Sequence, residues 1–270
     1  MSLLLCRQER VKEPFYIESL GLHIYSSQEL CYVIYHHPLL GLDGFIDSAL
    51  LDFLRNELDL GFTALKLERL LRSGENPDEA LTMLLQECDY YSLAEINRFR
   101  QTIAALRKLP PSEFAKEKAD YLFGLKQYGK AINIYQDILN VEKEGKINEE
   151  FIGHVWYNLG AAYARVFRFD LALEALEQAY EFLKDQSVVE KIFHLTKLDP
   201  GIKIHEKYLL LISEEEEAAW AEKFENAREL AEHTEELEKL RELFGKDSIR
   251  RMEGAAAMVK EWKQEYRSMA

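Results

Sequence analysis

The chain contains few of the residues that cross-link, kink or loosen a fold. Of its 270 residues only 3 are cysteine, 6 are proline and 13 are glycine, while 47% are hydrophobic. The three cysteines, Cys6, Cys31 and Cys88, form no CxxC pair, which argues against a disulfide framework and a structural zinc site. They predict a reducing, cytoplasmic setting. The composition excludes the collagen-like, low-complexity and wholly disordered classes.

Basic residues are also scarce. The chain has 34 Lys+Arg against 48 Asp+Glu, a net charge of −14, and the acidic excess is spread evenly along it. No segment is basic enough to hold a phosphate backbone, so we expect neither a nucleic acid nor a membrane surface as partner. No run approaches the roughly 18 apolar residues of a spanning helix. The start, Met1 to Cys6, lacks the charged region of a signal peptide, so we expect no export signal there.

No catalytic or ligand-binding motif is evident. The 7 histidines are scattered without an HExxH spacing, and the turn Gly41–Gly44 lacks the ligands of a calcium loop and the lysine of a phosphate loop. We interpret Cys31 and Cys88 as buried, inert thiols in apolar helices. The sequence therefore predicts no catalytic residue, no cofactor and no bound metal. The residues around which an enzymatic site could still lie are His36, His37, Asp43 and Asp47.

Residues 1–110 have the pattern of a small sheet followed by short helices. Short apolar pieces surround a break at Leu20–Gly21, which predicts a hairpin; the pieces are Leu3 to Cys6, Phe15 to Ile17 and Leu22 to Tyr25. Ser-x-x-Glu capping boxes at Ser26 and Ser92, and the run Asn76 to Glu79, predict helix starts. One apolar face of the last helix should contain Leu93, Ile96, Phe99, Ile103 and Leu106. The pair Pro110–Pro111 marks the expected boundary of this segment.

The middle segment, residues 111–200, shows internal self-similarity. Its clearest copy consists of Trp156, Leu159, Gly160, Tyr163, Phe169, Ala172 and Ala179. This spacing resembles the tetratricopeptide repeat, a pair of antiparallel helices. Gly160 and Ala172 are small where the two helices should cross closely, and larger residues fill the gaps beside them. The chain as a whole resembles bacterial proteins that contain such repeats.

A weaker copy of the repeat precedes it. Aligning Ala131 with Ala172 pairs Ala119 with Gly160, and the offset of 41 residues predicts an insertion around Asn140 to Asn148. Because repeats of this kind need a cap, a third helix should follow, from Ser187 to about Lys197, with Ser187 and Glu190 at its start.

Residues 201–270 predict two long helices. Ser213-x-x-Glu216 should open a single polar helix that reaches about Phe244, and Gly245–Asp247 should turn the chain. The apolar face of the final helix would carry Ile249, Met252, Ala256, Val259, Trp262 and Tyr266. We expect an antiparallel hairpin, with an intermolecular coiled coil as the alternative.

These segments together predict a mainly α fold. A short tetratricopeptide-like array, residues 111–200, would lie between a small N-terminal α/β cap, residues 1–110, and a C-terminal helical hairpin, residues 201–270. We expect a monomer or a weak homodimer.

The resemblance implies that the first helix of each repeat faces a concave, peptide-binding surface. The residues placed there by the alignment are Glu113, Lys116, Asp120, Phe123, His154, Tyr157, Asn158, Ala161 and Arg165. Of these we predict a peptide-binding role for Lys116, Asp120, Phe123, His154, Tyr157, Asn158 and Arg165. The alternative is that an exposed helix face simply carries polar residues.

Some adaptors of this repeat family clamp a terminal carboxylate. Lys116 and Asn158 match two of the clamp positions, but Asp120 replaces a required asparagine, and Val188 and Ile192 stand where cations belong. We therefore do not expect that clamp. The leading hypothesis is a non-catalytic scaffold or adaptor that binds a protein or peptide. The alternatives are a peptide-sensing regulator and an enzyme with its site in the N-terminal segment.

Overall fold

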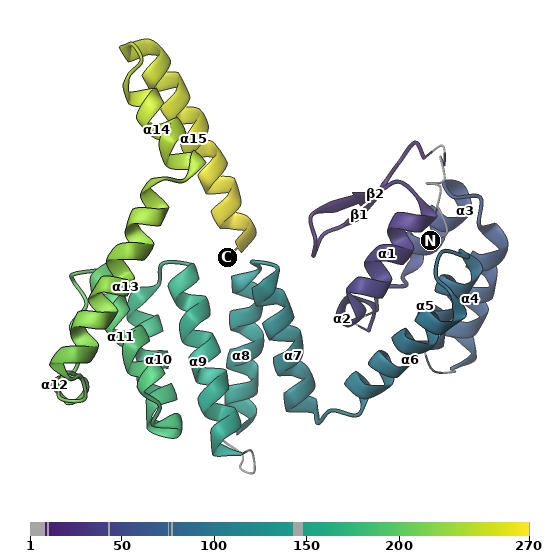
Figure 1. Cartoon of the computed structure of the whole chain (residues 1–270). Coiled ribbons are helices and arrows are strands. Elements are labelled where there is room, and N and C mark those ends of the chain that lie inside the picture. Colours follow the sequence, from purple (N-terminus) through teal and green to yellow (C-terminus); the bar gives the residue numbers. More distant parts are fainter. Residues whose placement is uncertain are drawn as a thin grey trace. The chain divides into compact units, whose positions relative to one another are not determined.

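The computed structural model describes residues 9, 11–42, 44–74, 76, 78–142 and 148–269. The expected strand piece Leu3 to Cys6, Asp43, Pro77 and most of the predicted insertion lie outside this part of the chain. The contacts divide the protein into two compact units, Met1–Phe114 and Ala115–Ala270, which are described one at a time. Helices make up most of both units (Figure 1), so the fold is mainly α with a small N-terminal sheet, as predicted.

The first unit begins with the predicted hairpin. Strands β1 (Phe15–Ile17) and β2 (Leu22–Ile24) pair antiparallel, with Tyr16 opposite His23. Gly21 closes the turn with a φ of 65°, a left-handed conformation that glycine adopts without a steric penalty. One end of each strand is anchored in the core, because Ile17 and Ile24 are buried.

Six helices complete the described part of the first unit. They are α1 (Ser27–His36), α2 (Pro38–Gly41), α3 (Ser48–Asn56), α4 (Gly61–Ser73), α5 (Asp78–Glu87) and α6 (Leu93–Arg107). Their apolar faces meet in one core around Leu30, Leu54 and Leu84. On α6 the predicted face is confirmed except at its first residue, because Leu93 is 72% exposed.

The predicted helix starts are confirmed in different degrees. At α6 both bonds of the capping box between Ser92 and Glu95 form. At α1 the Ser26 hydroxyl accepts the Glu29 amide, but the Glu29 carboxylate accepts the amide of Tyr25 instead of that of Ser26. The second half of that box was therefore predicted one residue too late.

In the second unit, two helical hairpins and a further helix form an array. It consists of α7 (Pro111–Gly124), which starts in the first unit, α8 (Tyr128–Glu142), α9 (Glu149–Arg165), α10 (Phe169–Leu183) and α11 (Gln186–Leu198). The close crossing predicted at Gly160 is confirmed: a Cβ there would lie 2.8 Å from Leu176 Cγ and 3.2 Å from the carbonyl oxygen of Ala172. Gly153, which the sequence analysis missed, makes a second close approach, to Leu183.

The turns that close the two hairpins repeat each other. In the first, the amide of Gln127 donates to the Leu122 carbonyl at 2.9 Å, and in the second the amide of Arg168 donates to the Tyr163 carbonyl at 3.0 Å. The residue before each donor, Lys126 or Phe167, is left-handed, with φ of 60° and 59°. These bonds are typical of helix C-terminal turns. Equivalent residues of the two turns, such as Leu122 and Tyr163, are 41 residues apart, which is the offset that the sequence alignment predicted.

The start of α11 corrects one expectation. Its N-cap is Asp185, whose carboxylate accepts the amide of Ser187 at 2.9 Å. The predicted cap, Ser187, therefore lies inside the helix. An aspartate two residues upstream, which is as good a capping residue as serine, takes this place. After α11, the short helix α12 (Glu206–Leu209) buries Tyr208 completely.

The C-terminal helices are α13 (Glu214–Glu232), α14 (Glu235–Phe244) and α15 (Ser248–Met269), which we call the C-terminal arm. The capping box of Ser213 and Glu216 forms as predicted. The single long helix was wrong, because it breaks at His233–Thr234, where the Thr234 hydroxyl donates to the Ala231 carbonyl. None of the residues of α13 is buried, so no packing holds the helix through this point.

The predicted hairpin holds for the shorter pair α14 and α15, which run antiparallel after the turn at Gly245–Asp247 (Figure 1). Leu243 of α14 is buried against Gly254 of α15. Among the described residues, no helix combines the length and the apolar character needed to cross a membrane.

Candidate functional site

One face of α9 carries the predicted residues of the second repeat. His154, Tyr157, Asn158, Ala161 and Arg165 follow helical spacing and therefore share a face. His154 and Arg165 at its two ends are exposed, and the three residues between them are half-buried. The opposite face of α9 is buried in the array core through residues that include Ile152, Val155 and Leu159.

At the middle of this face, three predicted residues bind one another. Asp120 of α7 accepts hydrogen bonds from Asn158 Nδ2 at 2.8 Å and from Lys116 Nζ at 2.7 Å. A further donor, the hydroxyl of Tyr135 on α8, lies 2.6 Å from Asp120 Oδ1. We call these four residues the Asp120 clasp. A ligand that used Lys116, Asp120 or Asn158 would have to compete with the clasp.

Tyr135 was missed by the sequence analysis, although it donates the most deeply buried of these bonds. Its side chain is 1% exposed, and burial, followed by the hydrogen bond to Asp120, raises the pKa of its hydroxyl well above the ordinary value. Tyr135 therefore stays a neutral donor. The clasp joins α7, α8 and α9, which gives these polar side chains a structural role.

At the α11 end of the face, the surroundings are charged. Burial raises the pKa of Tyr157, and the neighbouring carboxylates of Glu190 and Asp185 raise it further. Lys223 of α13 pairs with Glu190 at 2.6 Å, and His194 of α11 lies 3.2 Å from the carbonyl oxygen of Trp220. Helix α13 is thereby held along α11 and borders the face on this side.

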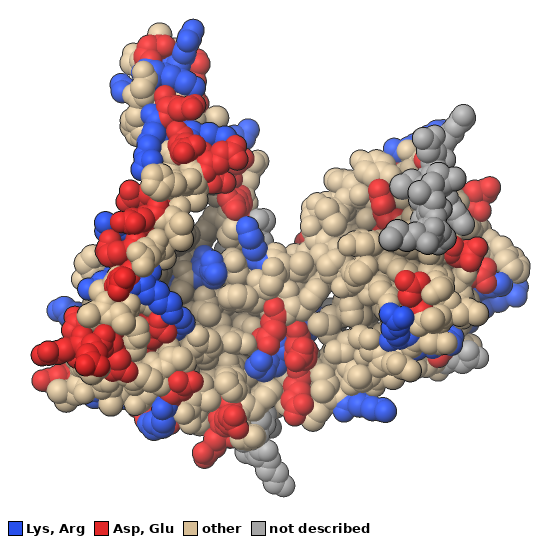
Figure 2. Space-filling model, viewed as in Figure 1, with Lys and Arg blue, Asp and Glu red and all other residues tan. Residues whose placement is uncertain are grey.

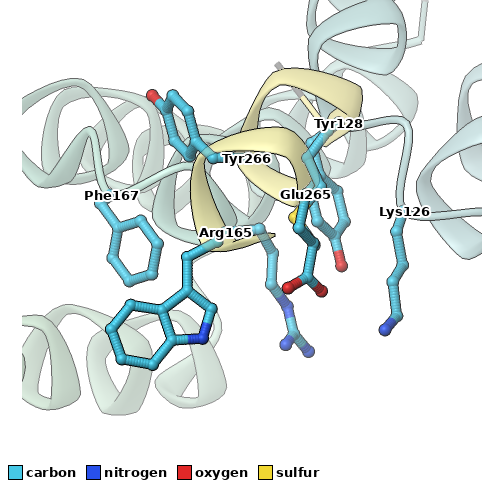
Figure 3. Close-up of a pocket in the computed structure, with 8 residues that line it drawn as sticks. Lys126, Tyr128, Arg165, Phe167, Glu265 and Tyr266 are labelled. Atoms are coloured by element: carbon cyan, nitrogen blue, oxygen red, sulfur yellow. The ribbon is translucent and has the colours of Figure 1, made fainter. Parts of the chain in front are cut away.

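At the other end of the face, Arg165 lines a half-open pocket of about 500 Å³. Three segments form it: the α7–α8 turn with Lys126 and Tyr128, the end of α9 and the following turn with Arg165 and Phe167, and the last part of α15 with Trp262, Glu265, Tyr266 and Met269. In Figure 3 the charged ends of Arg165, Lys126 and Glu265 reach toward the same space, and aromatic rings stand beside them.

Tyr266 and Met269 attach helix α15 at this pocket. The Tyr266 hydroxyl donates to the carbonyl of Val166 at 3.5 Å, and Met269 packs against the core of the array. The predicted residue Phe123 packs edge-on against Tyr128, which lines the pocket, with 5.1 Å between the two ring centres. Figure 2 shows the hollow between the arm and the array, with Lys and Arg side chains inside it.

Of the residues that line this pocket, Arg165 was predicted from the sequence and the others were not. Lys126 and Phe167 fall in turns, where the alignment offered no function for them. Trp262 and Tyr266 are spaced by four residues, a visible signal that was interpreted as packing within the hairpin. Both side chains are instead partly exposed, at 45% and 43%.

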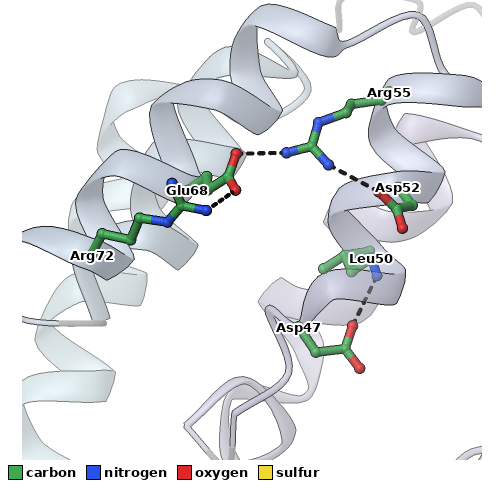
Figure 4. A network of polar contacts seen from close by, with 6 residues as sticks. All are labelled: Asp47, Leu50, Asp52, Arg55, Glu68 and Arg72. Carbon is green, nitrogen blue, oxygen red and sulfur yellow. Dashed lines mark hydrogen bonds and ion pairs between the residues drawn. The ribbon is translucent and has the colours of Figure 1, made fainter.

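The residues around which an enzyme site was considered have structural contacts. Asp47 caps α3 by accepting the amide of Leu50 at 2.8 Å (Figure 4). Next to it, Arg55 of α3 bridges to Glu68 of α4 at 2.8 Å, which ties the two helices together. Figure 4 also shows two further ion pairs of this network, from Arg55 to Asp52 and from Glu68 to Arg72.

At the end of α1, His36 packs against aromatic rings, and its charge acts on the neighbouring His37. His36 lies on Tyr32, with 4.2 Å between the ring centres, and burial, then the charge of His36, lowers the pKa of His37. Within the described residues, no group of three His, Cys, Asp or Glu side chains is placed to hold a metal ion. Asp43 lies outside these residues.

Comparison of the chain with protein-family models, with curated proteins and with solved structures found no match. Inference about function therefore depends on the residues and the geometry described above.

Proposed function

We propose that the protein is a non-catalytic scaffold or adaptor that binds a peptide segment of a partner on the hollowed face of α9. The observation that carries this proposal is the contrast between the two sides of α9. One side is buried in the array core, while the other carries the exposed His154 and Arg165 and the half-buried Tyr157. Tyr157 lies near Lys223 of α13, and Arg165 lines the pocket at the end of α15. A surface that combines rings and charges in a concavity is suited to peptide recognition.

The proposal includes a reducing, cytoplasmic setting and a repeat of the tetratricopeptide type. The scarcity of cysteine supports the first, and the small residues at the helix crossings together with the two matching turns support the second. The arm borders the face on both sides, because α13 lies along α11 and α15 ends at the pocket.

A displayed library of random decapeptides with free C-termini tests the proposal on the full chain. We expect enrichment of a sequence family whose binding falls at least about tenfold in the variants His154→Glu and Arg165→Glu. Both side chains are exposed, so neither change should disturb folding. Lys130→Glu, an exposed position on α8, is the matched control and should bind as the parent does.

Failure to enrich any peptide would overturn the proposal. So would enriched peptides whose binding changes with Lys130→Glu and not with the two α9 variants.

A further inference from the structure

The pocket at the end of α9 holds two cations that are not paired. Lys126 and Arg165 line it beside one carboxylate, that of Glu265, and neither cation forms an ion pair in the described part of the chain. Two cations against one carboxylate leave the pocket with an excess of positive charge. Cations that face a concavity and have no partner attract an anion, and the fork of arginine suits a carboxylate in particular.

Aromatic surface lies directly beside these cations. Phe167 is 70% exposed and Trp262 is 45% exposed, and both line the pocket with Arg165. Large exposed rings at a pocket favour a ligand with an apolar or aromatic group. A volume of about 500 Å³ is typical of a small-ligand site.

The two turns that end α7 and α9 each supply one residue of the pocket. Lys126 and Phe167 are both left-handed, at φ of 60° and 59°, where glycine is favoured and a side chain is disfavoured by roughly 1–2 kcal/mol. Each turn thus has a residue that is less favourable than glycine at this position, and both of these residues line the pocket.

We infer that the pocket binds a carboxylate attached to a large apolar or aromatic side chain, the chemistry of the last residue of a peptide. Lys126 and Arg165 would hold the carboxylate, and Phe167 and Trp262 would hold the side chain. The inference rests on the proposed function, because it places the C-terminus of the bound peptide at the end of α9. A free aromatic acid offers the same chemistry, and the test separates the two sources.

Fluorescence polarisation of an N-terminally labelled Gly-Gly-Gly-Phe peptide tests the inference. We expect the free acid to bind at least about tenfold more tightly than its C-terminal amide. A difference of this size corresponds to the one charge-assisted contact that the amide cannot make. Arg165→Gln should abolish this preference. Acetylphenylalanine, which has the end group without the chain, should compete at least about tenfold more weakly than the unlabelled peptide.

A glycine substitution separates binding from folding. Phe167→Gly removes a ring from the pocket and relieves the strained backbone, so the melting temperature should stay equal or rise while affinity for the acid falls about tenfold. Lys184→Gly is the matched control, because Lys184 is also left-handed, at φ of 50°, and does not line the pocket. It should leave the affinity unchanged.

Equal binding of acid and amide, or full affinity in Phe167→Gly, would overturn the inference. If acetylphenylalanine competes as well as the peptide, the claim that the ligand is the C-terminus of a peptide is overturned. If decapeptides from the displayed library bind through α9 but lose nothing on amidation, the inference fails and the proposed function stands. If no decapeptide is enriched, the proposed function itself fails.

Discussion

The array and the C-terminal arm belong to the same unit but are stabilised in different ways. In the array, helices meet across buried small residues such as Gly160, Ala172 and Ala179, and neighbouring helices share a continuous core. In the arm, Leu243 is buried, while Leu230 is 76% exposed and Met252 is 69% exposed. Close packing makes the array a rigid platform, whereas the arm depends on its contacts at the two ends.

This difference bears on the pocket, because the array supplies one wall and the arm supplies the other. Lys126, Arg165 and Phe167 stand on tightly bonded turns, but Trp262 stands on α15. We expect the α15 wall to open locally more often than the array does. A ligand that enters the pocket would then hold the end of the arm in place.

The largest expected effect is in the array. Gly160→Leu should lower the free energy of unfolding by about 3 kcal/mol, because the added side chain meets Leu176 and the backbone of Ala172, which has no room to move. Chemical denaturation of parent and variant measures this. A change of less than about 1 kcal/mol would show that α9 and α10 do not cross as described.

Removal of the Asp120 clasp should have the next largest effect. Asp120→Ala should lower stability by about 2 kcal/mol, because it leaves the buried hydroxyl of Tyr135 without an acceptor. In the double variant Asp120→Ala with Tyr135→Phe, part of this loss should return, since no buried donor remains unpaired. If the double variant is less stable than the sum of the single ones, the bond between the two residues is not the cause.

The arm should respond to a glycine change in the opposite way. Gly254→Ala adds a methyl group against the end of the Leu243 side chain, which can rotate away, and the helix gains about 1 kcal/mol of propensity. We expect no loss of stability and slower amide hydrogen exchange in α15. Faster exchange there would mean that the arm is packed as tightly as the array.

The smallest effect concerns a carboxylate in the outer part of the array. Burial raises the pKa of Glu177 above its ordinary value of 4.5, Oε1 has no donor in the described part of the chain, and His205 lies 3.6 Å from Oε2. Ionisation therefore destabilises the fold as the pH rises through the raised pKa.

Glu177→Gln should thus stabilise the protein by less than about 1 kcal/mol at pH 7. It should match the parent below pH 4.5, where the carboxyl group is protonated in both the folded and the unfolded state. Melting curves from pH 4 to pH 8 measure this. An advantage that grows toward low pH would contradict the assignment.

Local rules allowed much of this fold to be predicted from the sequence. Capping residues such as Ser92 and Ser213 mark helix starts because their chemistry acts within four residues. The small residue at Gly160 indicated a close crossing, because two helices can approach only where a side chain is missing. The hairpin at Gly21 followed from turn chemistry in the same way.

The errors arose where tertiary packing or competition between neighbours decides. The break at Thr234 follows an exposed stretch at the end of α13, where Leu230 is 76% exposed. Asp185 caps α11 two residues before the predicted cap, Ser187. The pocket was out of reach, because it requires that α15 return to the turns at Lys126 and Phe167. Contacts between segments so distant in sequence leave no local pattern.

The most direct test of the account is an amide chemical-shift map of the full chain with a decapeptide selected from the displayed library. We predict shifts that cluster on the exposed face of α9 and in the two turns around residues 125–128 and 165–168. Shifts confined to the first unit, or spread over the outer faces of α8 and α10 without α9, would contradict the claim that the hollowed face of the array is the binding surface.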